Sequence, residues 1–504
     1  MHVLYISLMV LFFFNLMIIV HEYGHFLAAR WRGLKIEKFG IWFGKPIFTK
    51  KFKDFDFVIG WIPAGGYVAL PQMAPMTAIE GETKNEVLPP VKPLDTAIVA
   101  FAGPLFSFLL AVVFSIIVWQ IGKPVSSSEM STYVGIVPPN TPADVAGLKQ
   151  GDKILEIDGN PVDRFSGFNG SIRWNIVKTE NEKIQIKYLR DGQIFNTTAI
   201  PQKSEVKQWQ RASLKEIGYI PSEIPVIAEN YNSLKAGDSI LKVNGAPVYY
   251  RTQIYDALCN KSAILTINRD GKELIIDVAG GNFEVESTFE NSPAAKAGVK
   301  GIVYSINGIK VETTKDFSDI VSKADNVFLD TSTGRYELKP ELINNAKKLG
   351  ITWKSAPIIW DNFGKITYDH PSPVQQIKSA AVTMYQTISA LTSSKSDIKL
   401  QHMSGPVGIM RLYYIMFESE YGLYFAIWFS VIFNINLAIL NMVPLPVLDG
   451  GHIVLAGIQG LIGRPVPAFI LNKIQTGFAF VLMAYMLYVT FFDVQDLSLL
   501  KWLK

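Results

Sequence analysis

The chain has a single cysteine, Cys259, among its 504 residues. One cysteine excludes an internal disulfide framework and a cysteine-based metal site. Charged residues are also scarce, at 18% of the chain against 49% apolar residues. The net charge is only +4, and no dense basic run indicates a nucleic-acid partner. The length exceeds one ordinary domain, so the composition indicates a membrane protein with a sizeable soluble part.

Four apolar runs are long enough to cross a bilayer, which needs about 20 apolar residues. We predict transmembrane helices at 1–30, 95–122, 421–448 and 474–493, with a loop at 449–473 and a short tail at 494–504. The first run lacks a preceding Lys or Arg and is too long for a signal peptide. We therefore expect it to be a retained helix.

Basic residues crowd the segment that follows the first run, 31–94. The eight that follow it closely are Arg30, Arg32, Lys35, Lys38, Lys45, Lys50, Lys51 and Lys53. Cytoplasmic loops carry such an excess, so this segment is predicted to lie in the cytosol. Both termini and the region 123–420 then lie outside it, and only Lys501 and Lys504 oppose this orientation.

The soluble region repeats a short pattern. It reads "NTPADVAGLKQGDKILEIDGNPV" at 140–162, "LKAGDSILKVNGAPV" at 234–248 and "NSPAAKAGVKGIVYSINGIKV" at 291–311. Each line ends in an apolar strand and an Asn/Asp-Gly hairpin signal. The lines resemble PDZ domains, α+β modules that bind peptide segments at a sheet edge. We expect two such domains, at 123–210 and 211–280, and a degenerate copy at 281–355. The alternative is that the later copies are only spacers.

The stretch "VHEYGHFLAAR", which begins at Val20, places ionisable groups inside the first apolar run. His21 and His25 are four residues apart, so a helix projects both from one face and they can share one Zn²⁺ ion. Glu22 is adjacent and can act as a general base on water at the metal. The alternative is a polar helix end that snorkels to the interface. Each ionisable group inside a membrane span costs about 2.5 kcal/mol or more, and this cost favours a metal site over a polar helix end.

A catalytic zinc needs a third protein ligand and an open position for water. The third run ends in "NMVPLPVLDGGHIV", where Pro444 and Pro446 break the helix and Asp449 follows. Broken backbone at membrane depth is tolerated where it lines a cavity, and we expect Pro444 and Pro446 to contact the substrate there. Asp449 could merely cap the next helix. Beside an incomplete His-Glu-x-x-His ligand set, it is predicted to be the third ligand.

These paired motifs resemble the site-2 protease family of intramembrane zinc metalloproteases, of the bacterial RseP (regulator of sigma-E protease) type. The resemblance extends to "FGKPIF" at Phe43, "IPAGGYVAL" at Ile62, "AGPLFSF" at Ala102 and "SGPVGI" at Ser404. It implies that His21, His25 and Asp449 bind zinc and that Glu22 is the catalytic base. It also implies that Asn436 and Asn441 hold the substrate near the metal.

Two features depart from the family pattern. Ser107 stands where the family's Gly-Pro-x-x-Asn motif has asparagine, and three repeats stand where members of this layout carry two PDZ domains. The first puts a shorter hydroxyl in place of an amide. The second changes the expected substrate gating.

Two further segments are predicted to touch the membrane. Residues 55–71 are predicted to form a hairpin around Gly65 and Gly66 that dips into the membrane. We expect the edge of this hairpin, which includes Tyr67 and Val68, to pair with an unwound substrate. The alternative is an ordinary cytosolic hairpin. Residues 372–394 read as a helix on the outer membrane face, or as a linker helix on the soluble domains.

The sequence therefore predicts a polytopic α-helical membrane protein with periplasmic PDZ-like domains, in a bacterial inner membrane and with its active site near the cytosolic side. The predicted substrates are single-span membrane proteins, of the anti-sigma-factor type or remnant signal peptides. The alternative is a catalytically inactive, membrane-anchored PDZ scaffold or a peptide-binding quality-control protein. A soluble zinc protease is disfavoured, because the motif lies in a spanning-length run.

Overall fold

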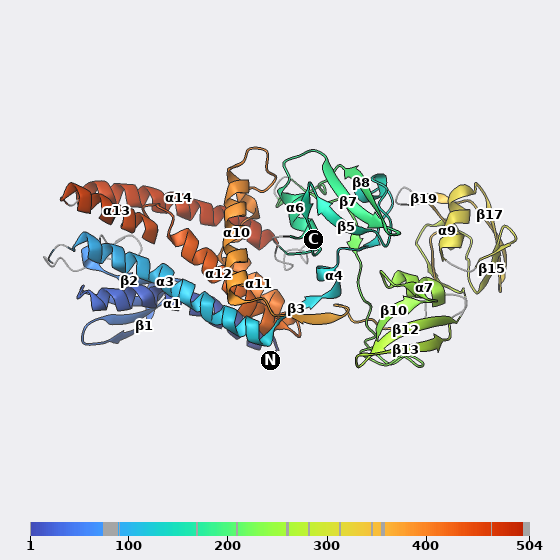
Figure 1. Ribbon diagram of the computed structural model, residues 1–504, viewed down its shortest axis with the longest axis horizontal. Helices are drawn as coiled ribbons and strands as arrows, with labels where there is room; N and C mark the ends of the chain where they lie inside the picture. Colours follow the sequence, from blue (N-terminus) through green and yellow to red (C-terminus); the bar gives the residue numbers. More distant parts are fainter. Residues whose placement is uncertain are drawn as a thin grey trace.

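The computed structural model describes residues 2–73, 89, 91–167, 170–207, 210–258, 262–280, 283–311, 314–343, 346–353, 358–464 and 466–496. Cys259, Lys501 and Lys504 lie outside the described residues, as does most of the predicted tail. The long helices gather at one end of the molecule, and β-rich units extend from them along its longest axis (Figure 1).

Four helices among the described residues are long and apolar enough to cross a membrane. They are α1 (His2–Trp31), α3 (Pro93–Ile121), α12 (Gly422–Asn441) and α14 (Ala468–Gln495). α1 packs along α3, and the core around them includes Met17, Phe114 and Tyr413. Tyr413 comes from the short helix α11 (Pro406–Glu418), and its hydroxyl is 2.7 Å from Ser430 Oγ of α12. The buried hydroxyl of Tyr413 thus finds its partner within the bundle.

The third span is shorter than the sequence indicated, and the segment after it is not simply a loop. α12 ends at Asn441, because the turn that carries Pro444 and Pro446 cannot continue a helix. A new helix, α13 (Asp449–Ile462), begins directly and packs against α3. The predicted boundaries 421–448 and 449–473 are corrected accordingly.

The strands after α1 form a small folded sheet rather than a hairpin that turns at Gly65 and Gly66. β1 (Lys38–Lys51) and β2 (Asp56–Ala69) are joined at 52–55. The start of β1, 38–41, has partners on both sides, 66–69 and 56–59, while 46–51 pairs with 56–60. Gly65 (φ +75°) lies where β2 changes direction, a backbone angle that glycine adopts freely. The sequence interpretation placed the turn wrongly; residues 66–69 form an outer edge of this sheet.

Three β-rich units share one strand order, which the repeats predict only in part. Unit 1 has β6-β5-β7-β8 (Asn160–Pro161, Lys153–Ile157, Ile184–Arg190, Gln193–Ala199) and α6 (Ile172–Lys178). Unit 2 has β11-β10-β12-β13 (Ala246–Pro247, Ser239–Val243, Ala263–Arg269, Lys272–Val278) and α7 (Thr252–Leu258). Unit 3 has β16-β15-β17-β18 (Ile309–Lys310, Val303–Ile306, Val327–Thr331, Gly334–Leu338) and α9 (Thr314–Lys323). Each has its own apolar core, so the third copy is a complete unit.

The unit boundaries differ from those drawn at 210 and 280. β9 (Ile220–Pro221) pairs with β4 (Val134–Ile136), so unit 1 extends to 221. Unit 2 is completed far along the chain, because Trp360 bridges Ile227 and enters its core. Unit 3, residues 283–353, is therefore an insertion in unit 2. Its ends, β14 (Val285–Thr288) and β21 (Ile351–Trp353), pair with each other.

Strand pairing and hydrogen bonds hold the segments that connect the β-rich units to the spanning helices. β3 (Lys123–Ser126) pairs with β22 (Ile366–Asp369). Asp493 of α14 is 1% exposed and accepts hydrogen bonds from Arg211 (2.9 Å) and from the amides of Gly405 (2.8 Å) and Gly408 (3.0 Å). The smaller remaining elements are η1 (Pro71–Met73), α4 (Ser127–Met130), α5 (Pro142–Val145), α8 (Pro293–Lys296), β19 (Glu341–Ile343), β20 (Ala346–Lys348) and η2 (Leu400–His402).

The segment predicted as a surface or linker helix is α10 (Pro373–Thr392), which a capping box of Ser372 and Gln375 starts. Ala380 of α10 packs with Ala111 of α3 and Ile435 of α12. Trp174 of unit 1 donates a hydrogen bond to Gln386 at 2.7 Å. The helix thus contacts both the spans and unit 1.

Candidate zinc centre

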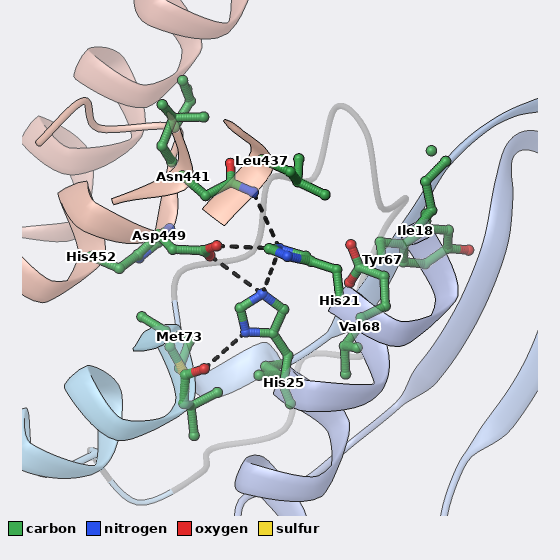
Figure 2. A pocket seen from close by; sticks show the side chains of 18 of the residues that line it. Ile18, His21, His25, Tyr67, Val68, Met73, Leu437, Asn441, Asp449 and His452 are labelled. Carbon is green, nitrogen blue, oxygen red and sulfur yellow. Dashed lines mark hydrogen bonds and ion pairs between the residues drawn. The ribbon is translucent and has the colours of Figure 1, made fainter. Parts of the chain in front are cut away.

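Two elements from opposite ends of the chain meet at the histidine pair of α1. His21 and His25 lie one turn apart, and Asp449 lies at the first position of α13. Asp449 Oδ2 is 3.3 Å from His21 Nε2, and its Oδ1 is 3.4 Å from His25 Nε2. Figure 2 shows the three side chains converging from α1 and α13. Their ligand atoms all lie within 4.8 Å of one another, so they can hold one ion.

The other ring nitrogen of each histidine is already engaged. His25 Nδ1 is 2.8 Å from the Val99 carbonyl, which can only accept, so this nitrogen carries the proton. His21 Nδ1 is 2.9 Å from Ser107 Oγ. Both partners belong to α3. They leave the two Nε2 atoms facing each other at 3.3 Å.

This arrangement fits a cation. An Nε2 atom of a neutral imidazole whose Nδ1 is protonated presents a lone pair, and two such lone pairs repel at this distance. A carboxylate facing the same point adds negative charge. A Zn²⁺ ion among the three groups would turn these repulsions into ligand bonds, and partners on the outer nitrogens orient such ligands.

Small residues let α1 and α3 approach closely enough for these contacts. A Cβ atom on Gly24 of α1 would lie 2.5 Å from the Ala102 carbonyl oxygen of α3. A Cβ atom on Gly103 would run into the His25 ring and lie 2.8 Å from His21 Nε2. The "AGPLFSF" stretch thus carries a physical requirement: glycine where the imidazoles pack and a hydroxyl where His21 needs a partner.

A cavity of about 370 Å³ opens beside the three ligands. Glu22 lines it, together with Gly65, Gly66, Tyr67 and Val68 of β2. A Cβ atom on Gly66 would lie 2.9 Å from Glu22 Cγ, so the backbone of the sheet edge passes directly against this glutamate. The candidate base and a strand edge therefore share one cavity with the ligands.

The remaining predicted residues lie in three different places. Asn441 lines the cavity, and its Nδ2 is 3.4 Å from His21 Nε2. Asn436 lines a neighbouring cavity of about 260 Å³ between α11, α12 and α14 instead. Its Oδ1 is buried and has no hydrogen-bond partner among the described residues. Pro444 and Pro446 are not among the cavity residues; they belong to the turn that delivers Asp449.

Sequence reasoning missed three participants. His452 lines the cavity one turn after Asp449, and its place in "DGGH" was the available signal. Phe43 lines it from β1. The Val99 carbonyl had no signal at all, because a backbone group carries no residue type.

The chain belongs to Peptidase family M50, whose family model matches residues 9–485. This is the site-2 protease family of membrane-embedded zinc metalloproteases, so the predicted family and cofactor are confirmed.

Curated relatives agree with the family. The chain is 28% identical over 502 residues to a protein of Neisseria meningitidis named "Putative zinc metalloprotease", covering 96% of this chain and 97% of the relative. It is 26% identical over 472 residues to "Protease RseP" of Yersinia pestis, covering 90% of each chain. It is 25% identical over 480 residues to "Regulator of sigma-E protease RseP" of Salmonella typhimurium, again covering 90% of each.

The Ser107–His21 contact predicts a measurable effect on metal binding. Ser107→Ala removes the partner that orients His21, so we expect zinc affinity to fall by roughly 10- to 100-fold. The measurement is chelator competition with purified full-length protein. Ser115→Ala is the matched control, because Ser115 is also a fully buried serine of α3, but its hydroxyl donates to the Val112 carbonyl of the same helix instead of contacting a histidine. Equal affinities in the two variants would contradict the role of Ser107.

Proposed function

We propose that this protein hydrolyses a peptide bond within or near the transmembrane segment of single-span membrane proteins. The observation that carries the proposal is the convergence of three zinc ligands, Glu22 and a strand edge on one cavity at a spanning helix. The proposed substrates are proteins of the anti-sigma-factor type or remnant signal peptides. The relatives named as regulators of sigma-E support the first class.

The residues divide the chemistry among them. His21, His25 and Asp449 would hold a zinc ion, which when bound would supply Lewis-acid polarisation of the scissile carbonyl and lower the pKa of water. Ser107 and the Val99 carbonyl orient the two imidazoles. Glu22 takes the proton from water and delivers it to the leaving amine. The Asn441 amide reaches the ligand cluster and can donate to the charge that develops on the carbonyl oxygen. Asn436, from its own cavity, holds a more distant part of the substrate.

Access to the scissile bond requires an unwound substrate. A transmembrane helix satisfies its carbonyls internally, and hydrocarbon offers no replacement partners. Residues 66–69 form a sheet edge beside Glu22, and an edge supplies backbone partners for an extended segment. Edge pairing can therefore replace the hydrogen bonds that the substrate helix loses.

The orientation proposed from the basic residues puts this site near the cytosolic side of a bacterial inner membrane. Units 1, 2 and 3 are then periplasmic and act as PDZ-like domains that exclude bulky ectodomains or bind peptides. A cavity of about 140 Å³ between α9 and β21 of unit 3 supports a peptide groove there. The same groove supports the second candidate function, a membrane-anchored peptide-binding scaffold.

Glu22→Gln separates these two functions. The amide keeps the size of the carboxylate but cannot accept the proton, so cleavage of a single-span substrate should fall by about 10²-fold or more. Zinc content and peptide binding should persist. Cleavage is followed by gel and mass spectrometry in proteoliposomes, with Glu37→Gln, outside the cavity, as the control. Equal cleavage by wild type and Glu22→Gln would mean that the observed cleavage does not depend on this site, and would favour the scaffold.

Val68→Pro tests the strand edge. Proline removes a backbone donor from the edge, so substrate cleavage should drop at least tenfold, an effect of about 1.4 kcal/mol. Val68→Ala is the control, because it shortens the side chain but keeps the N–H group. Cleavage rates are compared at equal zinc content, and equal rates for the two variants would reject edge pairing.

Excision of unit 3 tests the proposed size filter. Because β14 and β21 pair, residues 283–353 can be replaced by a short glycine linker without separating the flanking chain. We expect cleavage of a substrate with its ectodomain intact to rise towards that of a trimmed substrate. The ratio of the two rates is the measurement. An unchanged dependence on trimming would show that unit 3 does not filter.

A further inference from the structure

A second cavity, of about 350 Å³, lies between α1 and the β1–β2 sheet and shares no residue with the zinc cavity. Its wall is aromatic apart from one lysine. The lining residues are Tyr23, Phe26, Phe39, Phe48, Lys50, Phe52, Phe55 and Phe57. The volume falls within the roughly 300–1,000 Å³ range of ligand sites. We call it the aromatic cavity.

The wall is built as a connected set of rings. Phe26 of α1 meets Phe55 at 5.0 Å between ring centroids, and Phe55 stacks on Phe52 at 4.9 Å. Phe39 stacks on Phe57 at 6.1 Å, and Phe57 meets Phe48 at 6.5 Å. The rings fix the β1–β2 connection against the spanning helix, so the cavity is already formed.

The cavity opens where the bilayer must lie. Tyr23 belongs to the first span, about 12 Å before its end at Trp31, and is 45% exposed. Phe48 and Phe52 are 50% and 46% exposed. Aromatic side chains at the end of a span occupy the interface between hydrocarbon and headgroups. A bilayer that surrounds this span would therefore meet the open side of the cavity.

The one charged wall residue selects among lipids. Lys50 Nζ lies 5.3 Å from the centroid of the Phe52 ring and makes no ion pair with another described residue. Its aliphatic stem lines the apolar wall while its ammonium can reach the headgroup layer. Lys45, Lys51 and Lys53 lie on the same β1–β2 segment and outnumber its Asp54 and Asp56, so the surroundings of Lys50 keep a net positive charge. An anionic headgroup complements this charge, whereas a zwitterionic one does so poorly.

We propose that the aromatic cavity binds one acyl chain of an anionic phospholipid, whose phosphate pairs with Lys50. The lipid pins the β1–β2 sheet at the membrane surface, and the same sheet carries the edge at the zinc cavity. The site depends on the membrane location of α1 and not on proteolysis.

The test uses full-length protein in nanodiscs of phosphatidylcholine that contain a small fraction of photoreactive-acyl phosphatidylglycerol. After illumination, crosslinked peptides are mapped by mass spectrometry. We expect labels to concentrate on the lining residues at 23–26 and 48–57, at least threefold above those from photoreactive phosphatidylcholine. Lys50→Gln should remove this headgroup preference. Lys53→Gln, on the same hairpin but outside the wall, should keep it.

Three outcomes would overturn the proposal. Equal labelling by both lipids would show that the cavity does not recognise the headgroup. An equal loss of the headgroup preference in both lysine variants would attribute that preference to general surface charge. Labelling of the cavity by a photoreactive substrate span instead of lipid would assign it to peptide. Zinc content, measured in parallel, verifies folding of each variant, and a negative result would leave the protease function unaffected.

Discussion

Polar groups inside hydrocarbon must satisfy one another, and the whole active end of this molecule follows from that constraint. Two imidazoles and a carboxylate aimed at one point form a ligand set that a single cation can bind. Their outer faces are held by α3, through a hydroxyl and a backbone carbonyl. The close packing of α1 on α3, and the turn that ends α12 and starts α13, are the conditions under which these groups meet.

The same constraint bears on the proposed substrate. A transmembrane helix loses backbone hydrogen bonds when one of its carbonyls is exposed to attack, and the edge of a sheet can replace several of them at once. The β1–β2 sheet brings such an edge to the zinc cavity, where Gly66 lies against Glu22. Aromatic rings on the sheet meet α1, so the position of the edge relative to the base depends on packing between the sheet and the span.

The features that sequence predicted are those that depend on local spacing. His21 and His25 share a helix face because they are four residues apart, and spans are visible as apolar runs. Asp449 was predicted from its motif, but its meeting with the pair depends on the packing of α13 on α3. The turn at 52–55 was missed because Gly65 and Gly66 gave the stronger turn signal. The packing of Trp360 in the core of unit 2 could not be predicted, because a pairing between residues 227 and 360 produces no local pattern in the sequence.

The paired ends of unit 3 have a mechanical meaning. The chain enters and leaves unit 3 side by side because β14 and β21 pair, so the covalent attachment of unit 3 to unit 2 lies at one place. A second attachment lies between two helices, where the Thr314 hydroxyl of α9 donates a hydrogen bond to Asp256 of α7. A displacement of unit 3 would therefore be felt at α7, whose Ile254 and Leu258 belong to the core of unit 2, as well as at the paired chain ends.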